Sequence, residues 1–190
     1  MPQKEQVSVL PEPDISSLPE DIQKYFKICE EKLGLIPNVL LAYAYKPERL
    51  RRFMDMYNAI MLEESGLSKL EREMIAVVVS SANRCYYCLV AHGQAVRALS
   101  DDPQLGEMMV MNYRIAPLSD RHKAMLDFAW ALTTNPGEFD HQDREKLTTA
   151  GFSLEDYFDI CETVSFFNYT NRMAHGLEMM PNPEYHAVNR

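Results

Sequence analysis

Apolar residues recur at intervals of three and four along most of this chain, which is the spacing of a buried helix face. The first such segment begins at Ile22, and Gly34 follows its last apolar residue, where a helix is expected to end. Further helices are expected from Pro37, from Pro47, and over residues 103–113, 119–133, 140–149 and 153–175. No segment has comparable strand character, so the predicted fold class is all-α, a single-domain helical bundle.

A capping motif marks the helix in the middle of the chain. Ser68 and Glu71 have the spacing of a capping box, in which each side chain bonds to the backbone N–H of the other residue. The β-branched run at residues 77–79 is also compatible with a buried strand, but the cap favours a helix. Asn83 is then the expected N-cap of the next helix, which holds residues 85–99.

The chain of 190 residues is long enough for one domain with a sizeable core. Because four of the eleven prolines fall within the first nineteen residues, residues 1–20 are expected to form an extended N-terminal arm. The helical domain is expected over residues 21–180, followed by an irregular tail at 181–190. A faint internal echo links residues 66–83 with 151–168, and it is compatible with a duplication or with chance.

Composition argues against several classes of function. The net charge of −9 repels phosphate backbones, so no nucleic-acid partner is expected. The N-terminal segment lacks the basic start and apolar run of a signal peptide, and no stretch approaches about 18 consecutive apolar residues, so no membrane partner is expected. Four cysteines are too few for a secreted disulfide scaffold. The expected location is cytoplasmic, where a Cys-x-x-Cys pair is more often redox-active or metal-binding than structural.

The segment Cys85-Tyr86-Tyr87-Cys88, followed four residues later by His92, carries the clearest chemical signal. On a helix, Cys85, Cys88 and His92 share one face. The Cα atoms of residues three apart on a helix are separated by roughly 5 Å, which lies within the range of about 4.4–6.8 Å found for disulfides. The two thiols can therefore form and break a disulfide with little backbone movement, and His92 can exchange a proton with Cys88.

Glu73 is the candidate carboxylate behind His92. In one continuous helix these two residues would lie roughly 28 Å apart. If the chain instead reverses around residues 82–83 as a helical hairpin, positions 73 and 92 come level. A carboxylate in that place would orient the imidazole and stabilise its cationic form, as in acid–base relays.

Other interpretations of these residues remain open. The two thiols could be a purely structural pair. A metal site could use Cys85, Cys88, His92 and Glu73 as ligands, although no second Cys-x-x-Cys or His-x-x-x-His accompanies them. The remaining cysteines and histidines show no such constellation and are interpreted as core or surface residues: Cys29, Cys161, His122, His141, His175 and His186.

The arrangement of Glu73, eleven residues, and then Cys85-x-x-Cys88-x-x-x-His92 resembles the core motif of the alkylhydroperoxidase D family, within the carboxymuconolactone decarboxylase-like superfamily. The similarity extends over roughly residues 30–180 and is closest to a branch of uncharacterised peroxidase-related proteins. It is carried by the segments at 33–38, 66–68, 116–119 and 167–172.

This resemblance implies an all-helical subunit that assembles into trimers or hexamers and works without haem, flavin or metal. It further implies that Cys88 attacks the peroxide, that Cys85 resolves the product, and that His92 is a base oriented by Glu73. Well-studied members have a second histidine where this chain has Tyr87, which is neutral at pH 7 but can donate a hydrogen bond. This departure points to weak peroxidase activity or to a different reductant.

The expected function is a peroxiredoxin-type, thiol-dependent peroxidase that reduces hydroperoxides with a dithiol reductant and needs no cofactor. The alternatives are a general thiol–disulfide oxidoreductase, a carboxymuconolactone decarboxylase-like lyase, and a non-enzymatic metal-binding or redox-sensing module. Twelve methionines, ten tyrosines and eight phenylalanines are plentiful for one small core, so a homo-oligomer is expected.

Overall fold

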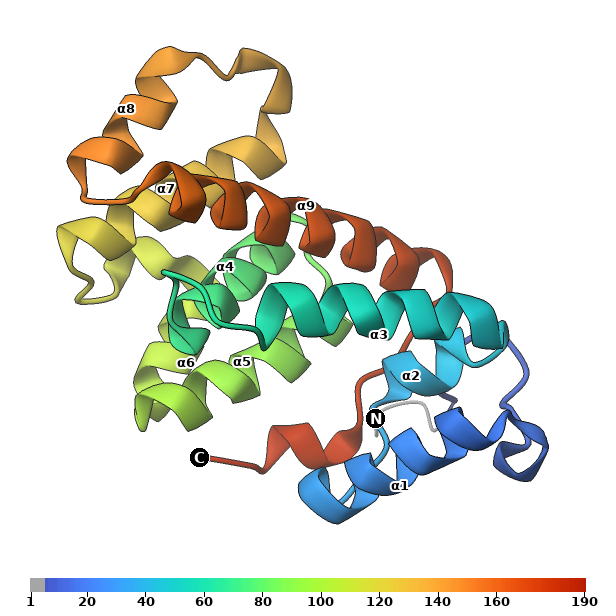
Figure 1. Cartoon of the computed structure of the whole chain (residues 1–190). Helices are drawn as coiled ribbons and strands as arrows, with labels where there is room; N and C mark the ends of the chain where they lie inside the picture. The colour runs from blue at the N-terminus through green and yellow to red at the C-terminus, as the bar shows by residue number, and fades with distance from the viewer. Residues whose placement is uncertain (1–5) are drawn as a thin grey trace.

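The computed structural model describes residues 6–190 and is built from helices packed around one central helix (Figure 1). Over these residues the nine α-helices are α1 (Glu20–Leu33), α2 (Asn38–Tyr43), α3 (Pro47–Met61), α4 (Lys69–Ala82), α5 (Tyr86–Ser100), α6 (Pro103–Asn112), α7 (Asp120–Thr134), α8 (His141–Thr149) and α9 (Leu154–Gly176). Short 3-10 helices lie at Ile15–Ser17, Tyr113–Ile115, Pro136–Glu138 and Pro183–His186. No strand occurs in the described part of the chain, which confirms the predicted all-α fold class.

The central helix is α4, around which α5, α6, α7 and α9 pack. The capping box at its start is confirmed, because Glu71 N–H donates to Ser68 Oγ at 3.1 Å and Ser68 N–H donates to Glu71 Oε2 at 2.8 Å. Residues 75–79 have no exposed surface. The β-branched run is therefore a buried helix segment and not a strand, because the helical backbone satisfies its own polar groups inside the core.

The chain reverses direction between α4 and α5. Arg84 adopts a left-handed backbone with φ of 55°, and Cys85 N–H donates to the Ser80 carbonyl at 2.9 Å. The prediction that Asn83 caps the second helix is wrong, since Asn83 is the C-cap of α4 and Cys85 occupies the N-cap of α5. The reversal takes three residues, so the second helix begins later than the capping preference of asparagine suggested.

Helix α9 lies beside α4 and runs in the same direction. Near their N-termini, Gly66 approaches the carboxylate of Asp156 so closely that a Cβ on Gly66 would lie 1.8 Å from Oδ1. At the other end, Asn83 Nδ2 donates to Asn168 Oδ1 at 3.0 Å. The two segments that echo each other in sequence are thus spatial neighbours.

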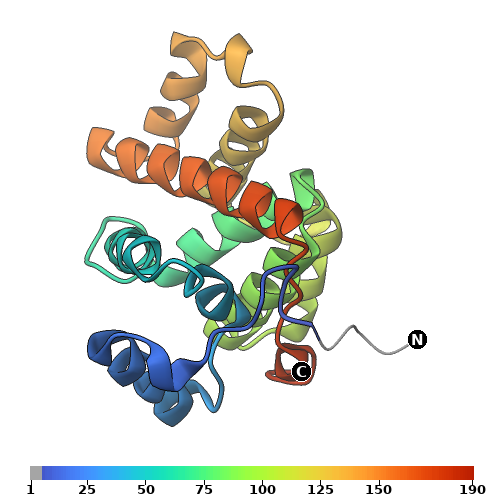
Figure 2. The same cartoon turned by 90° about the vertical axis from the view of Figure 1, so that its right-hand side faces the viewer.

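The segment before α1 and the C-terminal tail lie next to each other, at the end of the molecule away from α8. Helix α1 lies at the edge of that end (Figures 1 and 2). Of the predicted extended arm, residues 1–5 lie outside the described part, while Val7 is buried and its carbonyl accepts from Met180 N–H at 3.0 Å. The tail expected to be irregular contains the 3-10 helix Pro183–His186. Within residues 6–190 no helix has the length and apolar character needed to cross a membrane.

Candidate active site

The hairpin of α4 and α5 brings Glu73 and His92 into direct contact. Glu73 Oε2 lies 2.7 Å from His92 Nδ1, which confirms the predicted contact. Both side chains are largely buried, and the ring of Phe167 from α9 meets the imidazole edge-on with centroids 4.7 Å apart. Because Nδ1 is held by the carboxylate, Nε2 is the imidazole atom left for chemistry.

The two cysteines of the motif differ in access. Both are unpaired and buried, and their thiols share a hydrogen bond. Cys88, in the first turn of α5, lines a cavity together with His92, whereas Cys85 does not line it. A molecule in the cavity therefore meets the Cys88 sulfur first.

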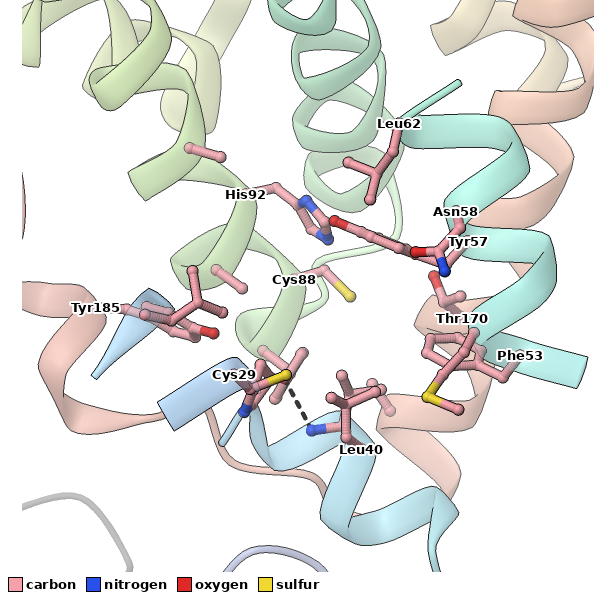
Figure 3. Close-up of a pocket in the computed structure, with 18 of the residues that line it drawn as sticks. Cys29, Leu40, Phe53, Tyr57, Asn58, Leu62, Cys88, His92, Thr170 and Tyr185 are labelled. Atoms are coloured by element: carbon pink, nitrogen blue, oxygen red, sulfur yellow. Dashed lines mark hydrogen bonds between the residues drawn. The ribbon is translucent and has the colours of Figure 1, made fainter. Parts of the chain in front are cut away.

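The cavity has a volume of about 550 Å³, within the range of small-molecule sites. Figure 3 shows its lining residues between α5 on one side and α2 and α3 on the other, with Cys88 and His92 facing Tyr57 and Phe53. Residues of α1, α9 and the tail complete its wall. Most of the lining is apolar or aromatic, which suits an organic ligand better than an ion.

The cysteine with the lower pKa is not the one that lines the cavity. The hydrogen bond from Cys88 lowers the pKa of Cys85 to about 7, with help from the backbone and from the positive fields of His175 and His92. The same hydrogen bond, together with burial, raises the pKa of Cys88 well above its usual value. Of the two thiols, Cys85 therefore ionises more readily, and it lies behind the sulfur that faces the cavity.

Sequence reasoning missed an amide network beneath the cysteines. Asn171, fully buried on α9, donates through Nδ2 to Ser80 Oγ at 3.0 Å and accepts through Oδ1 from Asn83 Nδ2 at 2.9 Å. Its backbone carbonyl lies 4.0 Å from Cys85 Sγ. Hydrogen bonds from Asn171 and Ser80 oppose the rise in the pKa of Cys88. The sequence held one indication of this network, because Asn171 lies in the segment at 167–172, which is one of those that carry the family resemblance.

His175 is a second imidazole near the pair. It is exposed in the last turn of α9, four residues after Asn171, and its Nε2 lies 3.1 Å from the Asn83 carbonyl. From there its positive charge contributes to the lowered pKa of Cys85. The interpretation of His175 as a core or surface residue left out its effect on the pKa of Cys85, which is far away in sequence.

Comparison with known proteins places this site in a family. Residues 47–109 match the carboxymuconolactone decarboxylase family. The whole chain is 57% identical to an uncharacterized peroxidase-related protein from Silicibacter sp. TM1040, whose crystal structure matches with a TM-score of 0.96 and full coverage of both chains. The chain belongs to the peroxidase-related branch of the carboxymuconolactone decarboxylase family.

Two further structures extend this comparison. A peroxidase-related protein from Ralstonia eutropha JMP134, described as an alkylhydroperoxidase AhpD core, is 38% identical over 98% of each chain with a TM-score of 0.95. The debrominase Bmp8, solved in complex with 2,3,4-tribromopyrrole, is 19% identical over 97% of this chain and 95% of its own, with a TM-score of 0.77. At that identity the likeness to Bmp8 shows a shared fold.

Tyr87 is the departure from the well-studied members of the wider family. Its hydroxyl accepts a hydrogen bond from Val39 N–H at 3.0 Å and so ties α2 to α5. Burial raises the pKa of Tyr87 well above its usual value, so the phenol stays neutral. Tyr87 lines the cavity, and its own proton remains available to a ligand.

The four residues considered as metal ligands are not arranged around a common point where an ion could bind. Glu73 hydrogen-bonds to His92, and the two free thiols hydrogen-bond to each other. Among residues 6–190, no group of three or more histidine, cysteine, aspartate or glutamate side chains could hold a metal ion.

Proposed function

We propose that this protein is a thiol-dependent peroxidase that reduces organic hydroperoxides through Cys85 and Cys88. The observation that carries the proposal is the position of Cys88, on the wall of a cavity beside His92 and hydrogen-bonded to Cys85 behind it. The volume and apolar lining of the cavity favour an organic hydroperoxide over hydrogen peroxide. Family membership supports the same class of activity.

In the first step, His92 accepts the Cys88 proton, and Glu73 stabilises the resulting cation. The Cys88 sulfur attacks the outer peroxide oxygen, so an S–O bond forms and the O–O bond breaks. Sulfur is oxidised to a sulfenic acid. The released alkoxide takes the proton from His92 and leaves as an alcohol. The Tyr87 hydroxyl is available to hold the bound peroxide.

In the second step, Cys85 attacks the sulfenic acid of Cys88. A disulfide forms, and the hydroxyl leaves as water with the proton that Cys85 gave up. The lowered pKa of Cys85 makes its thiolate available at neutral pH. In the third step, one thiol of an external dithiol attacks the Cys88 sulfur from the cavity and displaces Cys85, forming a mixed disulfide with Cys88. The second thiol of the reductant then displaces Cys88, so the reductant leaves as a disulfide and its two protons return to the cysteines. A thiol of low pKa leaves fastest in such an exchange.

A general thiol–disulfide oxidoreductase is the second candidate. It is favoured by the pKa of Cys85, about 7, which suits a leaving thiolate whatever the oxidant is. Both functions fit a homo-oligomer in the cytoplasm, where thiols are kept reduced. A lyase of the carboxymuconolactone decarboxylase type would instead turn over without either thiol.

The deciding experiment is a thiol titration before and after one equivalent of an organic hydroperoxide. The peroxidase proposal expects loss of two thiols and their recovery with a dithiol.

Cys88→Ser should abolish peroxide consumption, while Cys85→Ser should stop after one turnover with a sulfenic acid on Cys88, detected by mass spectrometry. If the sulfenic acid appears on Cys85 in the Cys88→Ser protein, the two roles are exchanged. If peroxide oxidises neither thiol but a disulfide substrate does, the protein is a thiol–disulfide oxidoreductase.

A further inference from the structure

We propose that Tyr57 is a further catalytic residue, whose phenol donates a hydrogen bond to the oxygen that leaves when Cys88 attacks the bound peroxide. This inference rests on the proposed peroxidase function. Tyr57 comes from α3, outside the cysteine motif, and lines the same cavity as Cys88 and His92. Figure 3 shows its ring reaching across the cavity toward the imidazole of His92.

The Tyr57 hydroxyl has no hydrogen-bond partner among residues 6–190, although the ring is held in place. The ring of Phe53 lies 6.4 Å from it and that of Phe166 lies 6.3 Å from it, measured between centroids. Buried tyrosine hydroxyls normally find a partner, because an unmade hydrogen bond is costly. The Tyr57 side chain is half-buried and lines the cavity. A rigid phenol that points into a cavity without a partner is therefore arranged to bond to what enters the cavity.

The phenol is also kept in its donor form. Burial, and then the negative charge of Glu73, raise the pKa of Tyr57 well above its usual value. At neutral pH it therefore carries its proton and cannot serve as a base. Tyr25, Tyr87 and Tyr185 also line the cavity, and the Tyr87 hydroxyl is held by Val39 N–H. Tyr57 is the phenol whose ring reaches toward the imidazole of His92 (Figure 3).

The reaction needs a hydrogen-bond donor when the O–O bond of the peroxide breaks. When the Cys88 sulfur bonds to the outer oxygen, the O–O bond breaks and the inner oxygen takes the electron pair as an alkoxide. His92 supplies the proton that completes the alcohol, and Tyr57 stabilises the charge before that proton arrives. A preorganised donor aimed at developing charge acts more strongly in the transition state than in the bound substrate.

The test compares two oxidants of similar bulk on Tyr57→Phe, which keeps the ring and its packing. With cumene hydroperoxide the leaving group is a basic alkoxide, which needs a hydrogen bond. With perbenzoic acid it is a weakly basic carboxylate. We expect the rate of Cys88 oxidation to fall by about tenfold or more with the hydroperoxide and to change little with the peracid. Alkylation of Cys88 by iodoacetamide, which has no leaving oxygen, should stay at the wild-type rate.

The matched control is Tyr157→Phe, the same substitution on an α9 tyrosine outside the cavity that packs on Phe128 at 5.5 Å. It should match the wild type with both oxidants. Equal losses with both oxidants in Tyr57→Phe would indicate a structural effect and overturn the inference, as would wild-type rates with both. If the wild type itself fails to react with either oxidant, the peroxidase proposal is wrong, and the role of Tyr57 falls with it.

Discussion

Glu73 Oε2 lies 2.7 Å from His92 Nδ1, although nineteen residues separate the two along the chain. The contact depends on the reversal between α4 and α5, and it leaves His92 Nε2 as the free atom of the imidazole. Phe167 from α9 meets the same ring edge-on. Three helices therefore fix the orientation of one imidazole beside Cys88.

Glu73→Gln should keep the fold, because the two side chains are nearly isosteric, but it removes the charge that stabilises the cationic imidazole. We expect Cys88 oxidation by an organic hydroperoxide to slow by about tenfold or more. Stopped-flow measurement of the reaction provides the check. Glu138→Gln, at an exposed residue of a 3-10 helix, is the control and should match the wild type. A wild-type rate in Glu73→Gln would remove the carboxylate from the relay.

His175→Gln should raise the pKa of Cys85 from about 7, because a positive field that lowers it is lost. A higher pKa means less thiolate at pH 7, so the ultraviolet absorbance of the thiolate should titrate at higher pH. Reduction of the Cys85–Cys88 disulfide by a dithiol should slow as well, since Cys85 becomes a poorer leaving group. His141→Gln, on α8 and away from the pair, should leave both measurements unchanged. An unshifted titration in His175→Gln would assign the lowered pKa of Cys85 to Cys88, the backbone and His92.

Asn171→Ala should destabilise the protein by about 2 kcal/mol, because it removes the two hydrogen bonds that the buried Asn171 amide makes to Ser80 and Asn83. It should also raise the pKa of Cys88 further and slow its reaction with peroxide. Urea unfolding and peroxide kinetics measure the two effects. In a double-mutant cycle with Ser80→Ala, the losses of stability should be less than additive, since the two residues share a hydrogen bond. Strict additivity would contradict this network.

Gly66→Ala should cost about 1 kcal/mol, because the new methyl group would lie 1.8 Å from Asp156 Oδ1. Asp156 forms the capping box of α9, accepting from Ser153 N–H at 2.8 Å. Thermal unfolding measures the cost. Gly137→Ala is the matched control, since nothing lies within 4 Å of its Cβ position. The penalty at Gly66 should disappear when Asp156 is first replaced by alanine, and its persistence there would rule out this contact as the cause.

A homo-oligomer is expected from the large apolar side chains left on the surface. Met111 is 81% exposed and Ile115 is 65% exposed, while Leu154 and Phe158 on α9 are 71% and 63% exposed. Burying such residues between subunits is favourable. Light scattering should give a multiple of the mass of one chain. Phe158→Glu should lower the measured mass if the exposed residues of α9 form the interface, and Met111→Glu should lower it if Met111 and Ile115 do. The mass of a single chain across micromolar concentrations would refute the expectation.

Much of the fold could be read from local signals. The helical spacing of apolar residues, the capping box at Ser68 and the glycine after α1 act over a few residues, so the sequence alone indicates them. The site motif is similarly local, because Cys85, Cys88 and His92 lie within two turns of one another. Glu73 could be paired with His92 because the position of the turn decides which residues of a helical hairpin lie level. A turn at residues 82–83 brings positions 73 and 92 together.

The remaining features depended on contacts between residues far apart in sequence, which only the tertiary structure decides. Tyr57 reaches the site because α3 packs across the cavity, and Asn171 and His175 reach the cysteines because α9 runs beside α4. The distribution of charge between Cys85 and Cys88 likewise follows from burial and from fields supplied by other helices. The sequence by itself determined the helices, the thiol pair and its histidine. Packing decided which sulfur faces the cavity and which side chains surround it, because the pairing of helix faces is a property of the whole core.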